Sequence, residues 1–279
     1  VGYRKDGRTY DAILTIAPVL GENGWLAGAV SSHQDVSQRK RLERARSQFI
    51  KNVSHELRTP VSNIKLYTNL LQAARNPEKT AQYMAVLADQ VGRLEHLIQD
   101  VLAITALDSG QPLASWELLS LPVLAESVVE RYADRAAAAG LSLRALPLPA
   151  ALPEVKGDAG GLVAALGELV ENAIHFTPAG GEVAIEVAPA QANGIEGVAI
   201  AVRDTGPGLE GEETERIFER FYRGRQAAAG HIPGSGLGLS IAQEIVRAHG
   251  GDISVSSGRQ VGSTFTVWLP ESSGQPDQG

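Results

Sequence analysis

Two long stretches of the chain repeat their apolar residues at the spacing of an α-helix. Between Gln38 and about Gln72 the apolar positions recur three, four or seven residues apart, at Ile50, Val53, Leu57, Ile64 and Leu71. After RNPEK, which breaks the pattern, a second stripe alternates steps of three and four as in a coiled-coil seam, at Met84, Leu87, Val91, Leu94, Ile98 and Val101. We therefore expect an antiparallel helical hairpin over residues 37–108. Because two helices bury little apolar surface alone, the pattern also predicts a homodimer whose two hairpins form a four-helix bundle.

The residues before these helices have the texture of β-strands. Two strand-like runs, RTYDAILTIAPVL and GWLAGAVSS, flank the turn residues GENG and predict a hairpin. A hairpin alone is marginally stable, so we expect it to lean on structure outside this sequence or on a partner. The opening VGYRKDG resembles neither a signal peptide nor a natural start, so we expect the sequence to be a fragment of a longer protein.

Beyond residue 108 the periodicity stops and a mixed pattern begins. The segment DSGQPLASW carries Gly and Pro, and it predicts a hinge over residues 109–116. Residues 117–270 then alternate helical and strand-like patterns, with helices near 121–139 and 160–175, strands near 141–146, 182–188 and 197–204, two further helices, and a closing strand pair, DISVSS and STFTVWLP. The polar tail 271–279 is expected to be disordered. The fold class is therefore α+β and multidomain: a helical hairpin in a dimeric bundle, followed by a two-layer α/β sandwich.

Composition narrows the possible partners. The net charge of −7 opposes nonspecific attraction to nucleic acid or to an anionic membrane surface, so neither is expected as a partner of this fragment. No apolar run approaches the ~20 residues of a membrane span. The absence of cysteine excludes disulfides and thiolate chemistry, and it suits a cytoplasmic location, although an anchor upstream stays open.

The motif SHELRTP, residues 54–60, concentrates reactive side chains on the first helix. His55 lies two positions from Val53 of the apolar stripe, so we expect it to face solvent. Thr59 follows one turn later on the same face, and Glu56 is adjacent to the histidine. A neutral imidazole is a good nucleophile, and a neighbouring carboxylate can take its second ring proton. Pro60 frees the Glu56 carbonyl and bends the helix. A surface histidine without a function remains the alternative at this point.

Several segments of the second half carry groups suited to a nucleotide. No P-loop motif occurs, and GPGLEG fits a dinucleotide fingerprint poorly because Pro207 and the acidic EGEE follow its first glycine. Asp204 in DTGPG can accept the exocyclic amine of adenine. The glycines of GSGLGLS precede an apolar helix and can expose amides to phosphate. Glu168 and Asn172 lie four residues apart and offer oxygen ligands to Mg²⁺. Each feature alone also fits an ordinary turn or a solvated helix face.

Together these segments resemble the bacterial two-component sensor histidine kinases. SHELRTP resembles the H-box of that family, and ELVENAIHFTP, DTGPG, IFERFYRG, GSGLGLS and GST resemble its N, G1, F, G2 and G3 boxes in the same order. The resemblance covers residues 38 to about 270. It implies a dimerisation and phosphotransfer hairpin and a Bergerat-type ATP-binding fold, with ATP and Mg²⁺ as cofactors.

The resemblance also implies roles for individual residues. His55 would be phosphorylated and would pass the phosphoryl group to an aspartate of a response regulator receiver domain; Glu56 would act as general base, and Thr59 would orient the water of a regulator phosphatase reaction. Arg223 would stabilise the transferred phosphate, and Glu168 and Asn172 would lie near Mg²⁺. The segment 225–236 would be an ATP lid anchored by Phe218 and Phe221. The nucleotide would contact Asn172, His175, Phe176, Asp204, Gly206, Gly208, Tyr222, Gly234, Gly236, Leu237, Gly238 and Thr264.

Some features depart from the family or leave alternatives open. His175 stands where many members carry Lys or Arg, which predicts weaker or more pH-dependent ATP binding. His33, His96, His231 and His249 have no metal-ligand spacing and are expected to be structural. Residues 1–36 resemble the end of a PAS sensor domain. The sequence leaves open whether His55 is phosphorylated within one subunit or across the dimer.

Two alternative functions fit parts of the same sequence pattern. One is a Bergerat-type ATPase of the gyrase or chaperone kind, which lacks an H-box. The other is a dimeric signalling scaffold, or a phosphatase-biased protein, that binds nucleotide without kinase activity.

Overall fold

The computed structural model describes residues 2–3, 9–20, 25–109, 116–147, 152–225, 234–258 and 260–272. The chain divides into two compact units, Val1–Thr59 and Pro60–Gly279. The division falls inside the long helix α1 (Ser37–Ala73), which continues through Pro60.

The first unit joins a β-hairpin to the start of α1. The short strands β1 (Gly2–Tyr3) and β2 (Thr9–Tyr10) pair with each other, and β3 (Ala12–Leu20) pairs antiparallel with β4 (Leu26–Asp35). The strand pairing agrees with the predicted hairpin, although the GENG turn and KDG lie outside the described residues. Two hydrogen bonds of the Asp11 backbone hold the start of α1. The Asp11 amide donates to Ser37 Oγ at 2.8 Å, and the Asp11 carbonyl accepts from the Val36 amide at 2.8 Å.

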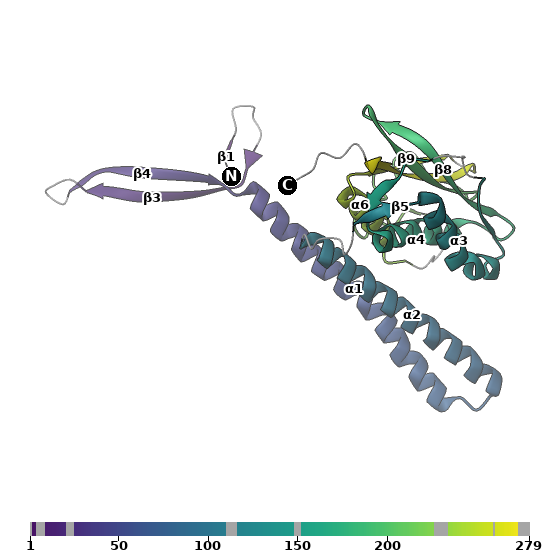
Figure 1. Ribbon diagram of the computed structural model, residues 1–279. Helices are drawn as coiled ribbons and strands as arrows, with labels where there is room; N and C mark the ends of the chain where they lie inside the picture. The colour runs from purple at the N-terminus through teal and green to yellow at the C-terminus, as the bar shows by residue number, and fades with distance from the viewer. Residues whose placement is uncertain are drawn as a thin grey trace. The chain divides into compact units, whose positions relative to one another are not determined.

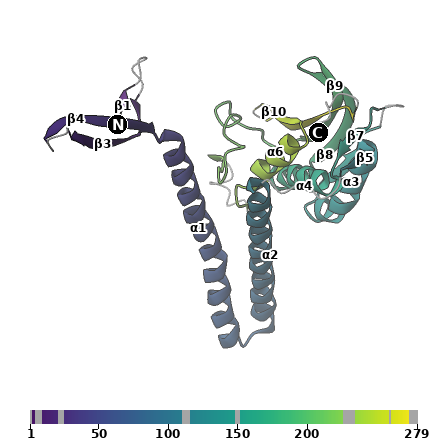
Figure 2. The ribbon, with the colours of Figure 1, turned by 60° about the vertical axis from the view of Figure 1, so that its left-hand side comes forward.

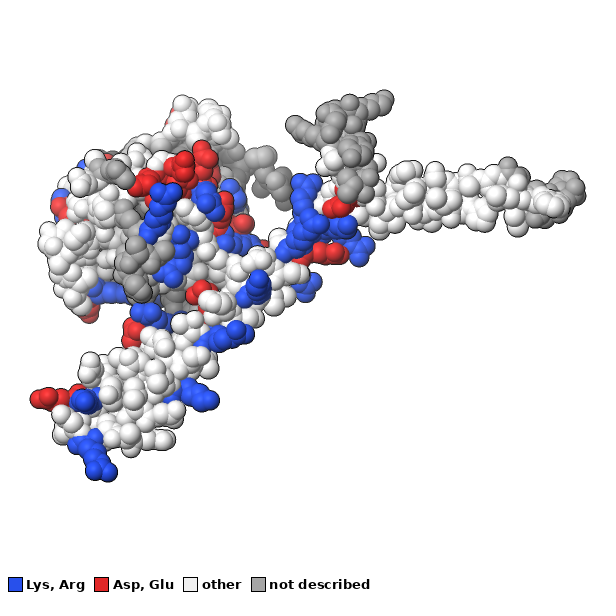
Figure 3. Space-filling view, turned by 180° about the vertical axis from the view of Figure 1, so that it is seen from behind, with Lys and Arg blue, Asp and Glu red and all other residues white. Residues whose placement is uncertain are grey.

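Both faces of the β3–β4 hairpin expose apolar side chains. Ile13 and Leu14 are neighbours in β3 and therefore point to opposite faces, yet they are 50% and 52% exposed. Figure 3 shows the hairpin as an uncharged surface, with Lys and Arg gathered where α1 begins. A two-stranded ribbon with two uncovered apolar faces has little to stabilise it, as expected from the sequence.

In the second unit, the end of α1 and helix α2 (Pro77–Asp108) form the predicted antiparallel hairpin. Asn63 Nδ2 donates to Gln90 Oε1 at 3.1 Å, and the rings of Tyr67 and Tyr83 meet edge to face at 5.8 Å. As the residue number rises along α1 its partner's number falls along α2, which identifies the antiparallel pairing. The break at RNPEK starts α2, because Asn76 caps the helix through its side chain and Pro77 fits the first helical position.

The remainder of this unit is a helical layer on a mixed sheet (Figures 1 and 2). The sheet has the order β10 (Asp252–Gly258), β11 (Gly262–Pro270), β9 (Ile195–Asp204), β8 (Glu182–Ala192), β6 (Ser142–Ala145), and only the β6–β8 pair is parallel. Helices α3 (Leu121–Ala138), α4 (Ala159–Phe176) and α6 (Gly238–Ala248) pack on one face. This is the predicted two-layer sandwich.

The core lies between these layers. Strand β11 alternates, with Phe265, Val267 and Leu269 buried, and α4 buries Leu162, Leu166 and Leu169 at helical spacing. Burying one such side chain contributes about 1.5–3 kcal/mol. The core therefore fixes which face of α4 is left to carry polar groups.

The structure also differs from the predicted elements. Of the two helices expected between β9 and β10, α6 is present, and within the described residues the stretch 211–221 forms turns and a bend. The short antiparallel pair β5 (Glu117–Leu119) and β7 (Val155–Gly157) was not predicted. Residues 271 and 272, assigned to the tail, donate backbone hydrogen bonds to Glu196 and Glu154. Residues 110–115 of the hinge, 226–233 of the lid and 273–279 of the tail lie outside the described residues.

His249 has the structural role expected for it. The ring is fully buried at the end of α6. Its Nε2 accepts the Asp158 amide at 2.9 Å, so its Nδ1 carries the proton and donates to the Ile245 carbonyl at 2.7 Å. The ring thereby links the end of α6 to the start of α4, where Asp158 caps the helix.

Replacing His249 with Ala is expected to destabilise the second unit by about 2–4 kcal/mol, because the change opens a cavity and removes the acceptor of the part-buried Asp158 amide. Urea denaturation followed by circular dichroism measures this change. The exposed His33 on β4 is the matched control, and its Ala variant should stay within about 0.5 kcal/mol of the parent. Equal midpoints for the two variants would contradict the role assigned to His249.

Candidate functional site

His55 lies on the solvent side of α1, as its spacing from Val53 predicts. Its side chain is 75% exposed, and its Nδ1 lies 3.8 Å from Glu56 Oε1. That distance is longer than a hydrogen bond but brings the carboxylate to one particular ring nitrogen. Thr59, one turn further along α1, is also exposed. The helix thus presents an imidazole, a carboxylate and a hydroxyl within one turn.

Asp204 is a buried carboxylate at the end of β9. Only 4% of the residue is exposed, and its Oδ1 accepts the amides of Gly206 at 2.8 Å and Ser263 at 3.2 Å. Burial raises the pKa of Asp204 above its usual range, and the two amide bonds oppose that shift. Both bonds recorded within the described residues use Oδ1, so Oδ2 is the oxygen suited to accept an amine from a ligand. Thr264 is the third residue of the neighbouring strand β11 and pairs with Arg203.

The predicted glycines occupy positions that other residues would not fit. A Cβ on Gly206 would lie 2.8 Å from Asp204 Oδ1 and 2.9 Å from the Phe176 carbonyl oxygen. Gly208 has φ of 74° and its missing side chain would overlap the Gly258 carbonyl. The DTGPG loop therefore packs tightly between the end of α4 and the turn that joins β10 to β11.

A backbone hydrogen bond joins Phe221, which precedes the predicted lid, to Gly236, the last residue of the lid. The Phe221 amide donates to the Gly236 carbonyl at 2.8 Å, and Phe221 has φ of 65°, an unusual value for a bulky residue. Phe218 contacts the core ring of Phe265 edge to face at 6.5 Å. Tyr222 lies under the guanidinium of Arg216 at 4.4 Å, and Arg223 beside it is exposed. Both phenylalanines of IFERFYRG thus attach the segment to its neighbours.

The glycine-rich segment GSGLGLS meets α4 where α6 begins. Leu237 is fully buried, and Gly234 and Gly236 precede it. A side chain on Gly238 would overlap Glu168 Oε2, so the first turn of α6 lies directly against that carboxylate. Asn172 and His175 follow Glu168 on α4, both half-buried. Residues 70 positions apart in sequence are thereby brought to one site.

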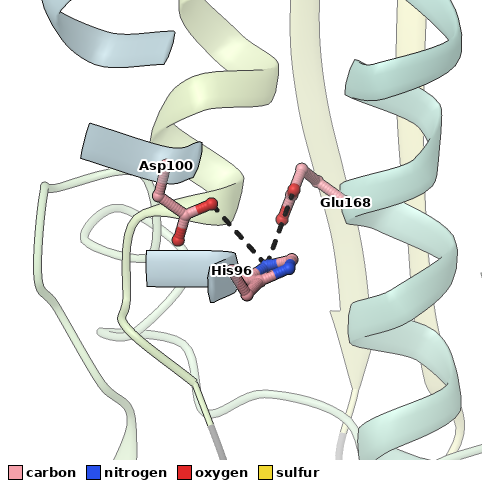
Figure 4. Close-up of side chains that lie close together, drawn as sticks. All are labelled: His96, Asp100 and Glu168. Atoms are coloured by element: carbon pink, nitrogen blue, oxygen red, sulfur yellow. Dashed lines mark ion pairs between the residues drawn. The ribbon is translucent and has the colours of Figure 1, made fainter. Parts of the chain in front are cut away.

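Two further residues lie at this site: His96, which was expected to be structural, and Asp100, which the sequence did not single out. His96 and Asp100, one turn apart on α2, lie beside Glu168 (Figure 4). His96 Nε2 is 3.6 Å from Asp100 Oδ1 and 4.0 Å from Glu168 Oε1. Ser235 Oγ donates to Asp100 Oδ2 at 2.7 Å. Their four-residue spacing was the available signal, but only the fold shows that α2 faces the nucleotide-site segments.

Burial and crowding shift the pKa values of these groups. Burial raises the pKa of Glu168 to about 7, and the charges of Asp100 and Glu171 add to the rise, while His96 and Arg135 oppose it. Burial also raises the pKa of Asp100, against the hydrogen bond from Ser235. Burial lowers the pKa of His175, so this side chain is neutral at physiological pH.

A bidentate ion pair joins α2 to the segment 216–223. Arg220 donates to both carboxylate oxygens of Asp108, at 2.7 and 2.9 Å. These hydrogen bonds lower the pKa of Asp108. The end of α2 and the IFERFYRG segment therefore share a defined contact.

Comparisons with known proteins match both parts of the chain. Residues 45–110 match the family model of the His Kinase A (phospho-acceptor) domain. Residues 157–273 match the histidine kinase-, DNA gyrase B- and HSP90-like ATPase. Among the described helices, none combines the length and the apolar character that a bilayer crossing requires.

Curated relatives align with nearly the whole chain. The chain is 34% identical over 265 residues to the sensor-like histidine kinase SenX3 of Mycobacterium tuberculosis (strain ATCC 25618 / H37Rv), covering 95% of this chain and 63% of SenX3. It is 30% identical over 258 residues to the sensor histidine kinase WalK of Bacillus subtilis (strain 168), covering 92% of this chain and 42% of WalK. The chain thus spans about half the length of these relatives.

Solved structures share the architecture. The histidine kinase ThkA, solved in complex with the response regulator protein TrrA, has a TM-score of 0.65 at 22% identity, covering 98% of this chain and 78% of that chain. At that identity the likeness shows the fold alone. Full-length ShkA, solved with AMPPNP, has a TM-score of 0.57 at 27% identity and covers 80% of this chain and 46% of that chain.

The raised pKa of Glu168 predicts how the stability of the second unit depends on pH. Between its ordinary value of 4.5 and about 7 the folded state holds a proton that the unfolded state has lost, so the free energy of unfolding falls as pH rises through this window. The side chain at position 168 cannot ionise in a Glu168→Gln variant. The free energy of unfolding of this variant should therefore lack the decrease due to Glu168, which is on the order of 3 kcal/mol.

The measurement is urea denaturation at several pH values in chelator and without nucleotide. Glu186→Gln, on the exposed side of β8, is the matched control and should follow the parent curve. Parallel curves for the parent and Glu168→Gln would refute the assignment.

Proposed function

This chain belongs to the two-component sensor histidine kinases, and from that membership we propose that it uses Mg²⁺-ATP to phosphorylate His55 and then transfers the phosphoryl group to an aspartate of a response regulator. Four segments that are distant in sequence meet around Asp204 and Glu168: helix α4, the DTGPG loop, the β10–β11 turn and the start of α6. The same chain presents an exposed histidine next to a carboxylate, and these observations together carry the proposal. The match to the ATPase family supports ATP as the phosphoryl donor.

The geometry of His55 indicates which nitrogen reacts. Because Nδ1 is the ring atom 3.8 Å from Glu56, the carboxylate can take the Nδ1 proton while Nε2 attacks. The Nε2 lone pair forms the new N–P bond to the γ-phosphorus, the bond to the β–γ bridging oxygen breaks, and ADP leaves with that electron pair. Glu56 is therefore proposed as the general base of this step.

The ATP-binding residues take their roles from their positions. Asp204 Oδ2 would accept the adenine amine, with Thr264, Gly206, Gly208 and Phe176 around the base. Gly234, Gly236, Leu237 and Gly238 would offer amides at the start of α6 to the phosphates. Tyr222 and the exposed Arg223 would lie beside the nucleotide, where Arg223 can stabilise charge on the transferred group.

The oxygen atoms on α4 fit a magnesium ion. Glu168 and Asn172 lie one turn apart and provide a carboxylate and an amide oxygen, the donors that Mg²⁺ prefers. When bound, the ion would neutralise phosphate charge. Packing of the apolar face of α4 in the core leaves both side chains on the opposite, polar face, and this orientation fixes the spacing between them.

The proposed kinase function also predicts the partners of this chain. A receiver domain would dock on the α1–α2 hairpin near His55, and Thr59 would orient the water that removes phosphate from the regulator. Apolar residues left exposed on the hairpin support a homodimer with a four-helix bundle. They are Val61, Leu66, Leu70, Met84, Val91, Ile98 and Leu102.

The uncovered β3–β4 hairpin supports assignment of residues 1–36 to the end of a PAS-like domain. We place the reaction in the cytoplasm.

Incubation with γ-labelled ATP and Mg²⁺ tests the proposal. Label should attach to the parent protein, be lost in acid and be kept in alkali, as a phosphohistidine requires. His55→Gln should reduce the acid-labile label by at least about 1,000-fold, because a glutamine amide is not a nucleophile and phosphate on a hydroxyl such as that of Thr59 would survive acid. His33→Gln should keep it. Label that survives in His55→Gln would refute the assignment, and ATP turnover without label would favour the ATPase alternative.

The neutral His175 gives a second expectation. A permanent charge near phosphate should strengthen ATP binding, so His175→Lys is expected to bind ATP about 3–10-fold more tightly at pH 8. Because the pKa of His175 is lowered, the parent should gain affinity only as the pH falls below about 6.5. Equilibrium titration with a fluorescent ATP analogue measures both effects. Unchanged affinity of the Lys variant at pH 8 would count against a phosphate contact.

A further inference from the structure

Three metal-ligating side chains from distant parts of the chain converge where α2 meets α4. His96 and Asp100 come from α2 and Glu168 from α4, and one atom of each lies within 4.8 Å of the others. Figure 4 shows both carboxylates pointing toward the imidazole of His96. The distances of 3.6 and 4.0 Å from Nε2 are too long for direct hydrogen bonds. The three groups therefore face a common point at ion-pair distances, without a hydrogen bond between them.

The crowding of two carboxylates requires compensation. Asp100 is 4% exposed and the Glu168 side chain is 20% exposed, so neither charge is well solvated. Like charges in such surroundings repel strongly. Arg135 supplies positive charge nearby, but its guanidinium pairs with Glu171. A divalent cation between the carboxylates would remove the repulsion.

Each carboxylate turns one oxygen toward His96 and the other toward a neighbouring segment. Ser235 Oγ donates to Asp100 Oδ2, and Asp100 Oδ1 is left to face His96. Glu168 Oε2 lies against Gly238, and Oε1 is left to face His96. The hydrogen bond from Ser235 orients Asp100, as the protein orients the ligating carboxylates of metal centres.

We propose that His96, Asp100 and Glu168 form a binding site for a divalent transition-metal ion of the zinc class. Ligand bonds of about 2.0–2.2 Å in tetrahedral geometry place ligand atoms about 3.4 Å apart, so the observed spacings need only a small closure. Water would fill the fourth position. An imidazole ligand favours zinc-class ions over Mg²⁺, which prefers oxygen alone.

The ion would also regulate the nucleotide site, and this consequence rests on the proposed function. Glu168 cannot serve Mg²⁺-ATP while it binds an ion together with α2. The same ion would join α2 to α4 and hold the helix against the ATP-binding layers. Zinc-class ions are therefore expected to inhibit autophosphorylation.

The first test measures metal binding without nucleotide. Untagged full chain is titrated with Co²⁺, whose visible absorption reports tetrahedral coordination, and the ion is then displaced with Zn²⁺. One ion per chain should bind, and His96→Ala and Asp100→Asn should each weaken binding about 10–100-fold. The matched controls are Glu95→Gln, next to His96 on the exposed side of α2, and His33→Ala. Circular dichroism checks that each variant is folded.

Two results would overturn the site: unchanged affinity in folded His96→Ala, or loss of binding in His55→Gln instead. A second test separates the site from its regulatory consequence. Zn²⁺ should reduce phosphohistidine formation at least about fivefold in the parent and much less in His96→Ala, with Mg²⁺-ATP in excess. Equal inhibition of both proteins would refute the regulatory role. Absence of phosphohistidine without Zn²⁺ would instead refute the proposed function, and the Co²⁺ titration would still decide the site.

Discussion

The burial of one face of α4 is the constraint on which the site depends. This helix packs its leucines between the sheet and its neighbouring helices, and a rotation of the helix would cost several buried side chains at about 1.5–3 kcal/mol each. Its polar residues recur at the same helical spacing on the other side, at Glu168, Glu171, Asn172 and His175. Hydrophobic packing thus determines the direction of groups that perform chemistry.

A second set of constraints is steric. The DTGPG loop and the start of α6 approach the rest of the site so closely that Gly206, Gly208 and Gly238 have no room for a Cβ. Close approach brings backbone amides and buried carboxylates together without long side chains to position them. The cost appears as raised pKa values at Asp204 and Glu168.

The sequence predicted the parts of the fold whose patterns are local. The apolar stripes, the Asn76–Pro77 start of α2 and the alternation in β11 each depend on neighbouring residues, and the structure confirms them. The stretch 211–221 has no such local pattern, and its turns are held partly by a contact between distant positions. The Glu213 carboxylate accepts the amides of Glu210 and Arg225, which joins the two ends of this stretch.

The placement of α2 could not be predicted, because no local pattern says what an exposed helix face will meet. His96 and Asp100 have an ordinary helical spacing, and their significance comes from Glu168 and Ser235, which are distant in sequence. The glycine boxes were predictable because close backbone approach restricts each position to one residue type.

The two polar attachments of α2 also have a mechanical meaning. Asp100 is bound by Ser235 and Asp108 by Arg220, and their separation of eight positions corresponds to about 12 Å along the helix. A single attachment would act as a pivot and leave the helix free to roll and tilt about it. Two attachments at this separation restrict the tilt of the helix. A torque applied to α2 is therefore transmitted both to the glycine-rich segment 234–240 and to the segment 217–224 that carries the two phenylalanines.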